Sequence, residues 1–169
     1  DNVFSDLLFG YQEKDFGADS FYSNLFPEEE EHTKTIFVRT GLDSRLDFGV
    51  LKNNLFLRKH RDKFILRRNN PTSVNYHTTY IYGLNSNLTL PLKFADLLLG
   101  LDIGTDQINS TNLEKHTRLH EAAFFDFNTK LTDKLTGGLG LRLDHYQGWP
   151  WQEPFNIGLG YNINRKLKL

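Results

Sequence analysis

The chain has 169 residues, with 20 Lys and Arg against 21 Asp and Glu, so its formal net charge is −1. This balance lacks the basic excess of a general nucleic-acid binder, and we predict no nucleic-acid partner. Cysteine is absent, which excludes disulfides, thiolate metal sites and cysteine nucleophiles. No apolar run reaches the roughly 18–20 residues of a transmembrane helix. The best stretch, residues 91–103, is interrupted by Lys93, Asp96 and Asp102.

Alternation of apolar and polar residues with period two is the strongest pattern along the chain, and it predicts β-strands. The first two segments, residues 3–12 and 36–42, alternate weakly. Residues 48–66 are extended in part, but their apolar positions change face partway, which indicates either a bulge or a wrongly assigned register. Five clearer segments follow, for a total of about eight strands: residues 75–90, 96–104, 118–131, 135–143 and 155–163.

The connections between these segments alternate in length. Alternating tight turns and long loops are typical of outer-membrane barrels, whose periplasmic turns are short and extracellular loops long. Segments of about 9–14 residues can cross a bilayer at a tilt, whereas globular strands average about 5–6 residues. We predict short links at residues 43–45, 91–93 and 132–134, and long polar links at residues 13–31, 61–74, 107–117 and 147–153.

The composition of the two faces also indicates a membrane barrel. The polar positions carry Asn, Asp, Arg, His and many Gly, with few of the Lys/Glu pairs that are usual on soluble surfaces. Aromatic residues cluster near segment ends, as amphipathic rings do at the membrane–water boundary. We therefore predict an all-β, antiparallel transmembrane β-barrel in the bacterial outer membrane, with apolar side chains toward lipid and polar ones toward the lumen.

A series of short segments recurs in a characteristic order. They are residues 10–22 (GYQEKDFGADSFY), 27–31 (PEEEE), 75–83, 99–102 (LGLD), 108–113 (INSTNL), 140–146 (GLRLDHY) and 158–161 (GLGY). In this order they resemble TonB-dependent outer-membrane receptors over nearly the whole chain, most closely the vitamin B12 receptor-like branch. The resemblance implies a 22-stranded barrel with a plugged lumen. Such a receptor imports a scarce small-molecule ligand, cobalamin or an iron–siderophore complex, with energy from TonB.

The chain departs from this family in size. About eight strands are barely a third of 22, and no plug domain or TonB box is recognised. We therefore predict that residues 1–169 are a single β-barrel region, which contacts TonB only through a plug domain absent from it. Methionine is missing, including at position 1, so we expect a processed form or an excised piece.

Ligand capture is expected in the long loops, and their aromatic side chains are the candidate ligand-binding residues. These are Phe21, Tyr22, Trp149 and Trp151. Carboxylates of the first long loop form a candidate Ca²⁺ site, because calcium prefers oxygen ligands and some vitamin B12 receptors hold calcium in extracellular loops. These are Asp15, Asp19, Glu28 and Glu30. The alternative is a solvated acidic loop, and no other cofactor is predicted.

A basic cluster surrounds the next long loop. Its members are Arg58, Lys59, Arg61, Lys63, Arg67 and Arg68. Outer-membrane lipid and the phosphates of lipopolysaccharide are natural partners for such cations. A salt network with the acidic loop is the alternative.

No constellation of residues predicts an enzyme. His116 and His120 would lie about 13 Å apart on a strand, too far for one metal ion. Nothing places a nucleophile, a base and an orienting acid together, so we predict a receptor without catalytic residues. Two other interpretations stay open: a self-contained small eight-stranded outer-membrane barrel with a structural or adhesive role, and a soluble lipocalin-like binder with its apolar residues inside.

Overall fold

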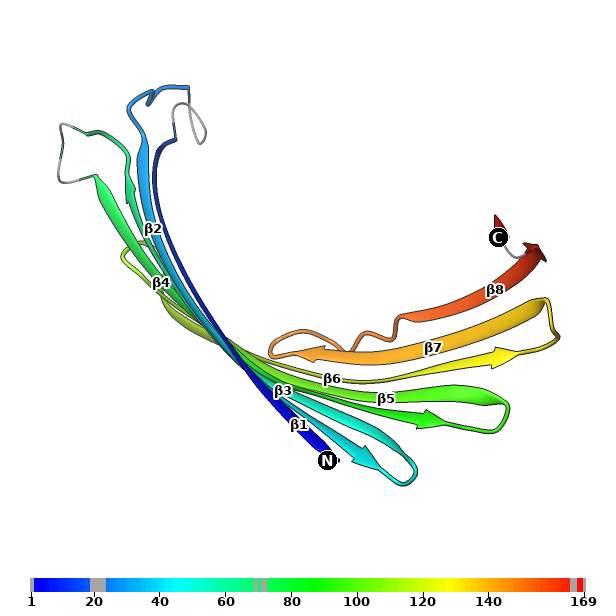
Figure 1. Cartoon of the computed structure of the whole chain (residues 1–169). Helices are drawn as coiled ribbons and strands as arrows, with labels where there is room; N and C mark the ends of the chain where they lie inside the picture. The colour runs from blue at the N-terminus through cyan, green and yellow to red at the C-terminus, as the bar shows by residue number, and fades with distance from the viewer. Residues whose placement is uncertain (1, 19–23, 69, 71–72, 165–166, 169) are drawn as a thin grey trace.

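The structure, a computed structural model, describes residues 2–18, 24–68, 70, 73–164 and 167–168 (Figure 1). These residues form one antiparallel sheet in which each strand pairs with the next one along the chain. The strands are β1 (Val3–Gly17), β2 (Glu30–Leu46), β3 (Gly49–Ile65), β4 (Val74–Pro91), β5 (Ala95–Ser110), β6 (Glu114–Lys130), β7 (Leu135–Tyr146), β8 (Phe155–Asn164) and β9 (Leu167–Lys168). Because β9 has two residues, eight full strands remain, as the sequence predicts.

The sheet is strongly curved and open within the described part of the chain. Its strand order begins at β1 and ends at β9, and neither of these two strands pairs with the other. Figure 1 shows the strands as a single bent layer with β1 and β8 far apart along it. The described residues include no helix long and apolar enough to cross a membrane. The predicted all-β, antiparallel class is confirmed.

The connections alternate in length as predicted, except for the one between β5 and β6. One end of the sheet carries the short turns at residues 47–48, 92–94 and 131–134, which Figure 1 shows as tight hairpins. The other end, called the loop end below, carries the connections at residues 18–29, 66–73, 111–113 and 147–154.

Several predicted boundaries are wrong because the strands run further than the alternation. The long link predicted at residues 107–117 is a tight connection at 111–113, and the links predicted at 13–31 and 61–74 include strand ends. Near the loop end both faces of the strands carry polar residues, so apolar and polar positions no longer alternate in the sequence. The turn predicted at residues 43–45 lies at 47–48, and an ion pair of 3.2 Å between Lys52 and Asp43 joins β2 to β3 there.

The bulge predicted within residues 48–66 is also wrong. β3 pairs with β2 and with β4 in one unbroken register over its length. The apparent change of face arises because Val50, Phe56 and Phe64 lie on the polar face of β3, whereas Leu51, Leu55 and Leu57 lie on its apolar face.

Cross-strand partners share a face, so the register divides the side chains into an apolar face and a polar face. On the apolar face, one continuous row crosses β3 to β8: Leu51, Leu88, Leu99, Phe125, Leu141 and Phe155. Leu7 is 73% exposed and Ile157 is 73% exposed. The only buried hydrophobic residues in the described ranges are Ala18, Ala95 and Ala122. Most of the large apolar side chains therefore cover one side of the sheet instead of filling a core, although a few, such as Phe4 and Leu8, lie on the other side.

Candidate functional site: the polar face and the loop end

The polar face carries a ladder of charged and amide side chains across the middle of the sheet. The ladder is a row of successive cross-strand partners from β1 to β7, in which two members, Gly41 and Ala122, are small. The row consists of Asp6, Gly41, Asn54, Asn85, Asp102, Ala122 and Asp144. Arginines from neighbouring rows connect its members.

Arg39 of β2 connects the first part of the ladder. Its Nη2 lies 3.2 Å from Asp6 Oδ1 on β1, and its Nε donates to Asn54 Oδ1 on β3 at 2.9 Å. Gly41 occupies the row position between these partners, and a Cβ there would overlap the Asp6 carboxylate and the Arg39 guanidinium. The glycine therefore lets one arginine span three strands.

Arg142 of β7 connects the second part. Its Nη2 lies 2.8 Å from Asp102 Oδ2 on β5, and its Nε donates to Asp144 Oδ1 at 2.8 Å. Ala122 on β6 lies in register between the two carboxylates, and its small side chain leaves the guanidinium room to pass. Asn85 of β4 donates to Asp102, which extends the ladder to β4. Arg142 thus balances two carboxylates that the register places in one row.

Toward the loop end, the polar face becomes rich in histidine and arginine, and it carries one tyrosine, Tyr146. Four of the six histidines share this face: His60, His77, His116 and His120. Arg118 pairs with Asp106 at 2.6 Å and lies over the Tyr146 ring at 5.0 Å. His60 Nδ1 is 2.8 Å from Thr35 Oγ1. Exposed Arg58 has no hydrogen-bond or ion-pair partner among the described residues. This end of the face can therefore offer cations and aromatic rings to a ligand.

Two buried polar atoms of this region also lack a hydrogen-bond partner within the described structure: Asp62 Oδ1 and His120 Nδ1. Buried polar atoms in folded proteins are nearly always satisfied, so each has capacity for a group from outside the sheet.

The predicted ligand-binding aromatics lie around the loop end where the structure describes them. Trp149 is 64% exposed in the connection at residues 147–154. Trp151 stacks on His145 with ring centroids 4.7 Å apart, and His145 Nδ1 is 3.1 Å from Glu121 Oε1. His145 and Glu121 belong to the apolar face, so Trp151 lies on that side. Phe21 and Tyr22 fall outside the described residues, and ligand contact by these four aromatics stays a prediction.

The structure brings two of the four predicted calcium ligands together, but around a histidine. His32 Nδ1 lies 2.5 Å from Asp15 Oδ1, and His32 Nε2 lies 3.2 Å from Glu30 Oε1. Arg68 Nε contacts the other oxygen of Glu30 at 3.1 Å. Glu28 is exposed, and Asp19 lies outside the described residues. The described chain contains no group of three or more His, Cys, Asp or Glu that could hold a metal ion. The calcium site stays a prediction.

The register splits the basic cluster, which the sequence treats as one unit. Arg58 lies on the polar face and Lys59, Arg61 and Lys63 on the apolar one. Arg68 forms the ion pair with Glu30 described above, which is one contact of the alternative salt network predicted between the two loops. Because successive residues of a strand face opposite sides of the sheet, the odd and even positions along this segment could have predicted the split.

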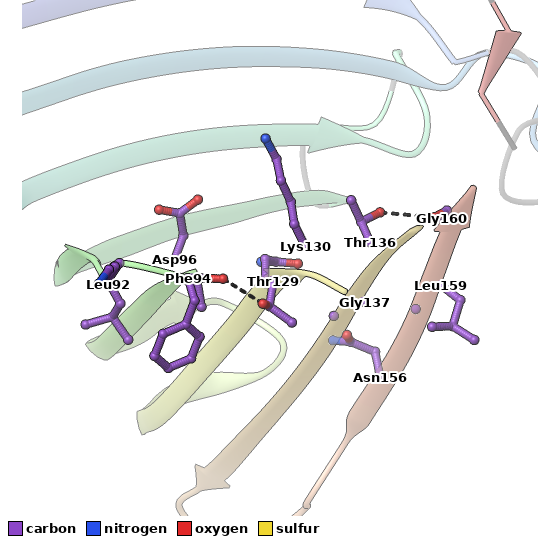
Figure 2. A pocket seen from close by; sticks show the side chains of 15 residues that line it. Leu92, Phe94, Asp96, Thr129, Lys130, Thr136, Gly137, Asn156, Leu159 and Gly160 are labelled. Carbon is purple, nitrogen blue, oxygen red and sulfur yellow. Dashed lines mark hydrogen bonds between the residues drawn. The ribbon is translucent and has the colours of Figure 1, made fainter. Parts of the chain in front are cut away.

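Sequence reasoning missed a depression at the opposite, short-turn end of the polar face. It has a volume of about 690 Å³ and lies among the ends of β5 to β8 (Figure 2). Glycines of β7 and β8 leave the space, and Asp96 and Lys130 project to the same side of the sheet. Thr129 closes the rim by donating to the Phe94 carbonyl at 2.7 Å.

Comparison with known proteins gives a fold and no close relative. No family model and no curated protein matches the sequence. The siderophore receptor PirA from Pseudomonas aeruginosa matches 97% of this chain with a TM-score of 0.81 at 15% identity, over 28% of its own length. A variant of the ferric enterobactin receptor PfeA from the same species matches 95% with a TM-score of 0.75 at 14% identity, over 29% of its length.

A third match, PirA from Acinetobacter baumannii, has a TM-score of 0.71 at 16% identity and covers 96% of this chain and 29% of the receptor. The chain therefore spans less than a third of the receptors it matches. The likeness to TonB-dependent receptors predicted from the sequence is confirmed at the level of the fold. The chain has the fold of a section of an outer-membrane receptor β-barrel.

Proposed function

We propose that the chain is a barrel section of an outer-membrane receptor for TonB-dependent uptake of a scarce ligand, with its polar face toward the lumen. The observation that carries the proposal is a continuous, exposed apolar face on a sheet that has the fold of siderophore receptors. Soluble monomers rarely expose apolar patches larger than a few hundred Å². In a bilayer the same face would be satisfied by lipid.

The ligand class that fits the polar face best is an anionic metal chelate of the siderophore type. Arg58 and Arg118 supply cations near the loop end, and Tyr146 supplies a ring beside Arg118. Charge-assisted hydrogen bonds from arginine suit carboxylate or catecholate oxygens. The similar receptors are described as siderophore and ferric enterobactin receptors, which agrees with this class. Cobalamin is the second candidate, because the sequence resembles the vitamin B12 receptor-like branch most closely.

The proposed division of labour assigns capture to the loop end and passage to the polar face. The loops at residues 18–29 and 147–154 would hold the ligand outside the membrane, and the chain itself would bind without catalysing a reaction. All described strands of residues 1–169 belong to the sheet. We propose that coupling to TonB acts through a plug domain, as the resemblance to these receptors implies.

The test uses the whole protein that carries this chain, extracted from membranes in detergent. Binding of ferric enterobactin and of cyanocobalamin is measured for the native protein, for R58Q/R118Q, and for a control at the short-turn end, K93Q/K134Q. We expect the arginine variant to bind the ferric chelate at least about tenfold more weakly, because each charged hydrogen bond contributes about 1.5–3 kcal/mol. The control should bind as the native protein does.

Two outcomes would contradict the proposal at different levels. Recovery of the native protein in the aqueous phase without detergent contradicts the membrane receptor and favours the lipocalin-like alternative. Membrane extraction with tight binding of cyanocobalamin alone keeps the receptor and contradicts the siderophore class.

A further inference from the structure

Histidines flank the two arginines to which the proposed function assigns ligand binding. On β6, His116 and His120 lie two residues before and two residues after Arg118, so all three share the polar face. On β3, His60 follows Arg58 by the same two-residue step. Alternate residues of a strand are about 6.6 Å apart. Each arginine therefore has a histidine within reach of a ligand that it binds.

A fourth histidine, His77 of β4, completes the group. It lies directly opposite Asp62 of β3 and diagonal to His60, and the Cβ atoms of direct partners are about 4.5–5.5 Å apart. Two further carboxylates, Asp106 of β5 and Glu114 of β6, share the same face and level. The four histidines, the two arginines and these three carboxylates are called the histidine patch below.

With neutral histidines, the histidine patch attracts an anion poorly. Arg118 is already paired with Asp106 at 2.6 Å. Asp62 and Glu114 outnumber the remaining cation, Arg58, so two arginines against three carboxylates give a net charge of −1. Protonation of the four histidines adds four positive charges and reverses the sign, to +3. Because an unperturbed histidine has a pKa of about 6.5, this reversal falls between about pH 8 and pH 5.

The elements packed against the histidine patch do not offset this change. On the β3 side, the facing residues of β2 are threonines and a phenylalanine. On the β6 side, β7 presents Tyr146, which is uncharged in this pH range. Toward the short-turn end, Arg39 is paired with β1, and Arg142 is paired with both Asp102 and Asp144. The histidines are therefore the groups that set the charge of this surface near neutral pH.

The environment of β3 opposes ionisation until an anion arrives. His60 and Asp62 lie beyond the apolar band, because the apolar face carries Lys59 and Arg61 at this level. Burial, and after it the nearby charge of Arg58, lowers the pKa of His60. Burial also raises the pKa of Asp62. A bound anion favours the protonated form of both groups, so anion binding and proton uptake are linked.

We propose that the histidine patch is a proton-dependent binding site for the anionic ligand, with an affinity that rises as the histidines are protonated. The inference rests on the proposed function, because it deepens the assignment of the ligand to Arg58 and Arg118. Imidazolium rings donate charge-assisted hydrogen bonds to carboxylate or catecholate oxygens, as guanidinium groups do. The buried Nδ1 of His120 has no hydrogen-bond partner among the described residues and offers one further position for such a bond.

The experiment measures the affinity of the whole protein in detergent for ferric enterobactin at pH 8 and at pH 6. The variant H60Q/H77Q/H116Q/H120Q removes the protonatable rings. The matched control is H32Q/H145Q, which removes the other two of the six histidines, both on the apolar face. Each protein is judged by the ratio of its own affinities at the two pH values, so a change in basal binding cancels. Calorimetry at pH 7 in two buffers of different ionisation enthalpy measures proton uptake on binding.

We expect the native protein to bind at least about tenfold more tightly at pH 6 than at pH 8. A unit charge about 4 Å from an anion contributes roughly fivefold even in water, and several histidines act together. The control should keep this ratio and the proton uptake. The glutamine variant should keep only the ratio that the titration of the chelate itself produces, without proton uptake by the protein.

A variant with a fixed charge separates charge from structure. His116 is exposed, so H116K does not depend on the folding of the fourfold variant. We expect H116K to bind ferric enterobactin more tightly than the native protein at pH 8 and to show a smaller ratio between pH 6 and pH 8. Loss of a merely structural histidine would not increase the affinity.

Equal affinity ratios in the native protein and the glutamine variant would overturn the inference, as would binding without proton uptake. An H116K variant that binds no more tightly than the native protein at pH 8 would overturn it as well. These results leave the proposed function intact if R58Q/R118Q still weakens binding at both pH values. A native protein that binds no ferric enterobactin at either pH would instead remove the siderophore class and the inference together.

Discussion

The two faces of β5 to β7 differ in what satisfies their side chains. On the polar face, Arg142 links Asp102 to Asp144 across β6, so charges from β5 and β7 find their partners within the sheet. On the apolar face, Leu99 and Leu141 lie in one cross-strand row, 40% and 39% exposed, and no other described part of the chain forms a layer over them. Many charges of the polar face are thus paired within the sheet, whereas the side chains of the apolar face need an apolar environment outside the sheet. Substitutions can separate these two dependences.

The largest expected effect comes from placing a charge on the apolar face. In the whole protein folded in phospholipid vesicles, we expect Leu99→Arg to lower the free energy of unfolding by about 2–4 kcal/mol, as arginine on the lipid side of a barrel does near the midplane. Urea-induced unfolding followed by tryptophan fluorescence measures the change.

The neighbouring residue provides the matched control. Leu98 lies on the polar face opposite Asp126, so Leu98→Arg would place the cation near a carboxylate. We expect this variant to lose less than about 1 kcal/mol, because a partly exposed pair offsets the cost of the new charge. Equal losses at positions 98 and 99 would contradict the assignment of the faces.

A smaller effect is expected from Arg142→Gln, which leaves Asp102 and Asp144 without their shared cation. The Arg142 side chain is 36% exposed, so screening by water limits the loss, and we expect about 1–2 kcal/mol of unfolding free energy. Arg118→Gln removes a more exposed pair, 52% at the arginine, and should cost less than R142Q. The same unfolding experiment compares the two variants. A larger loss of unfolding free energy in Arg118→Gln than in Arg142→Gln would contradict the view that the ladder stabilises the polar face most.

The smallest effect concerns close packing on the polar face. The Phe124 ring lies over Gly100, and a Cβ at Gly100 would overlap the ring, so Gly100→Ala must displace Phe124. We expect a loss of about 1 kcal/mol in thermal or urea unfolding. At Gly158 nothing lies within 4 Å of the added Cβ, and Gly158→Ala should be neutral or slightly stabilising. A neutral Gly100→Ala would show that the ring is not held there.

The strands that could be predicted from the sequence are those with apolar residues on one face and polar residues on the other. Residues 135–143 and 155–163 alternate cleanly, and both segments are strands within one or a few residues of the predicted bounds. Near the loop end the prediction failed, because Lys59, His60 and Arg61 are polar on both faces and give no period-two signal. The strands continue there through backbone pairing with their neighbours, which a single segment cannot reveal.

The candidate site was less accessible to sequence reasoning. Arg142 reaches Asp102 only because the register places Ala122 between β5 and β7, and this needs two strand pairings at once. The division of Arg58 from Lys59 follows from parity alone and was within reach. Ligand specificity could not be predicted, because it depends on side chains that loops and strands bring together from distant parts of the chain.

The proposed orientation has the apolar face in contact with lipid and the polar face in contact with water. A nitroxide scan of residues 97–104 on β5, in the whole protein reconstituted into vesicles, tests it most directly. We expect nitroxide labels at positions 97, 99, 101 and 103 to be relaxed mainly by oxygen dissolved in lipid, and labels at the even positions to be relaxed mainly by a water-soluble nickel chelate. The opposite phase, or no alternation along the strand, would contradict it.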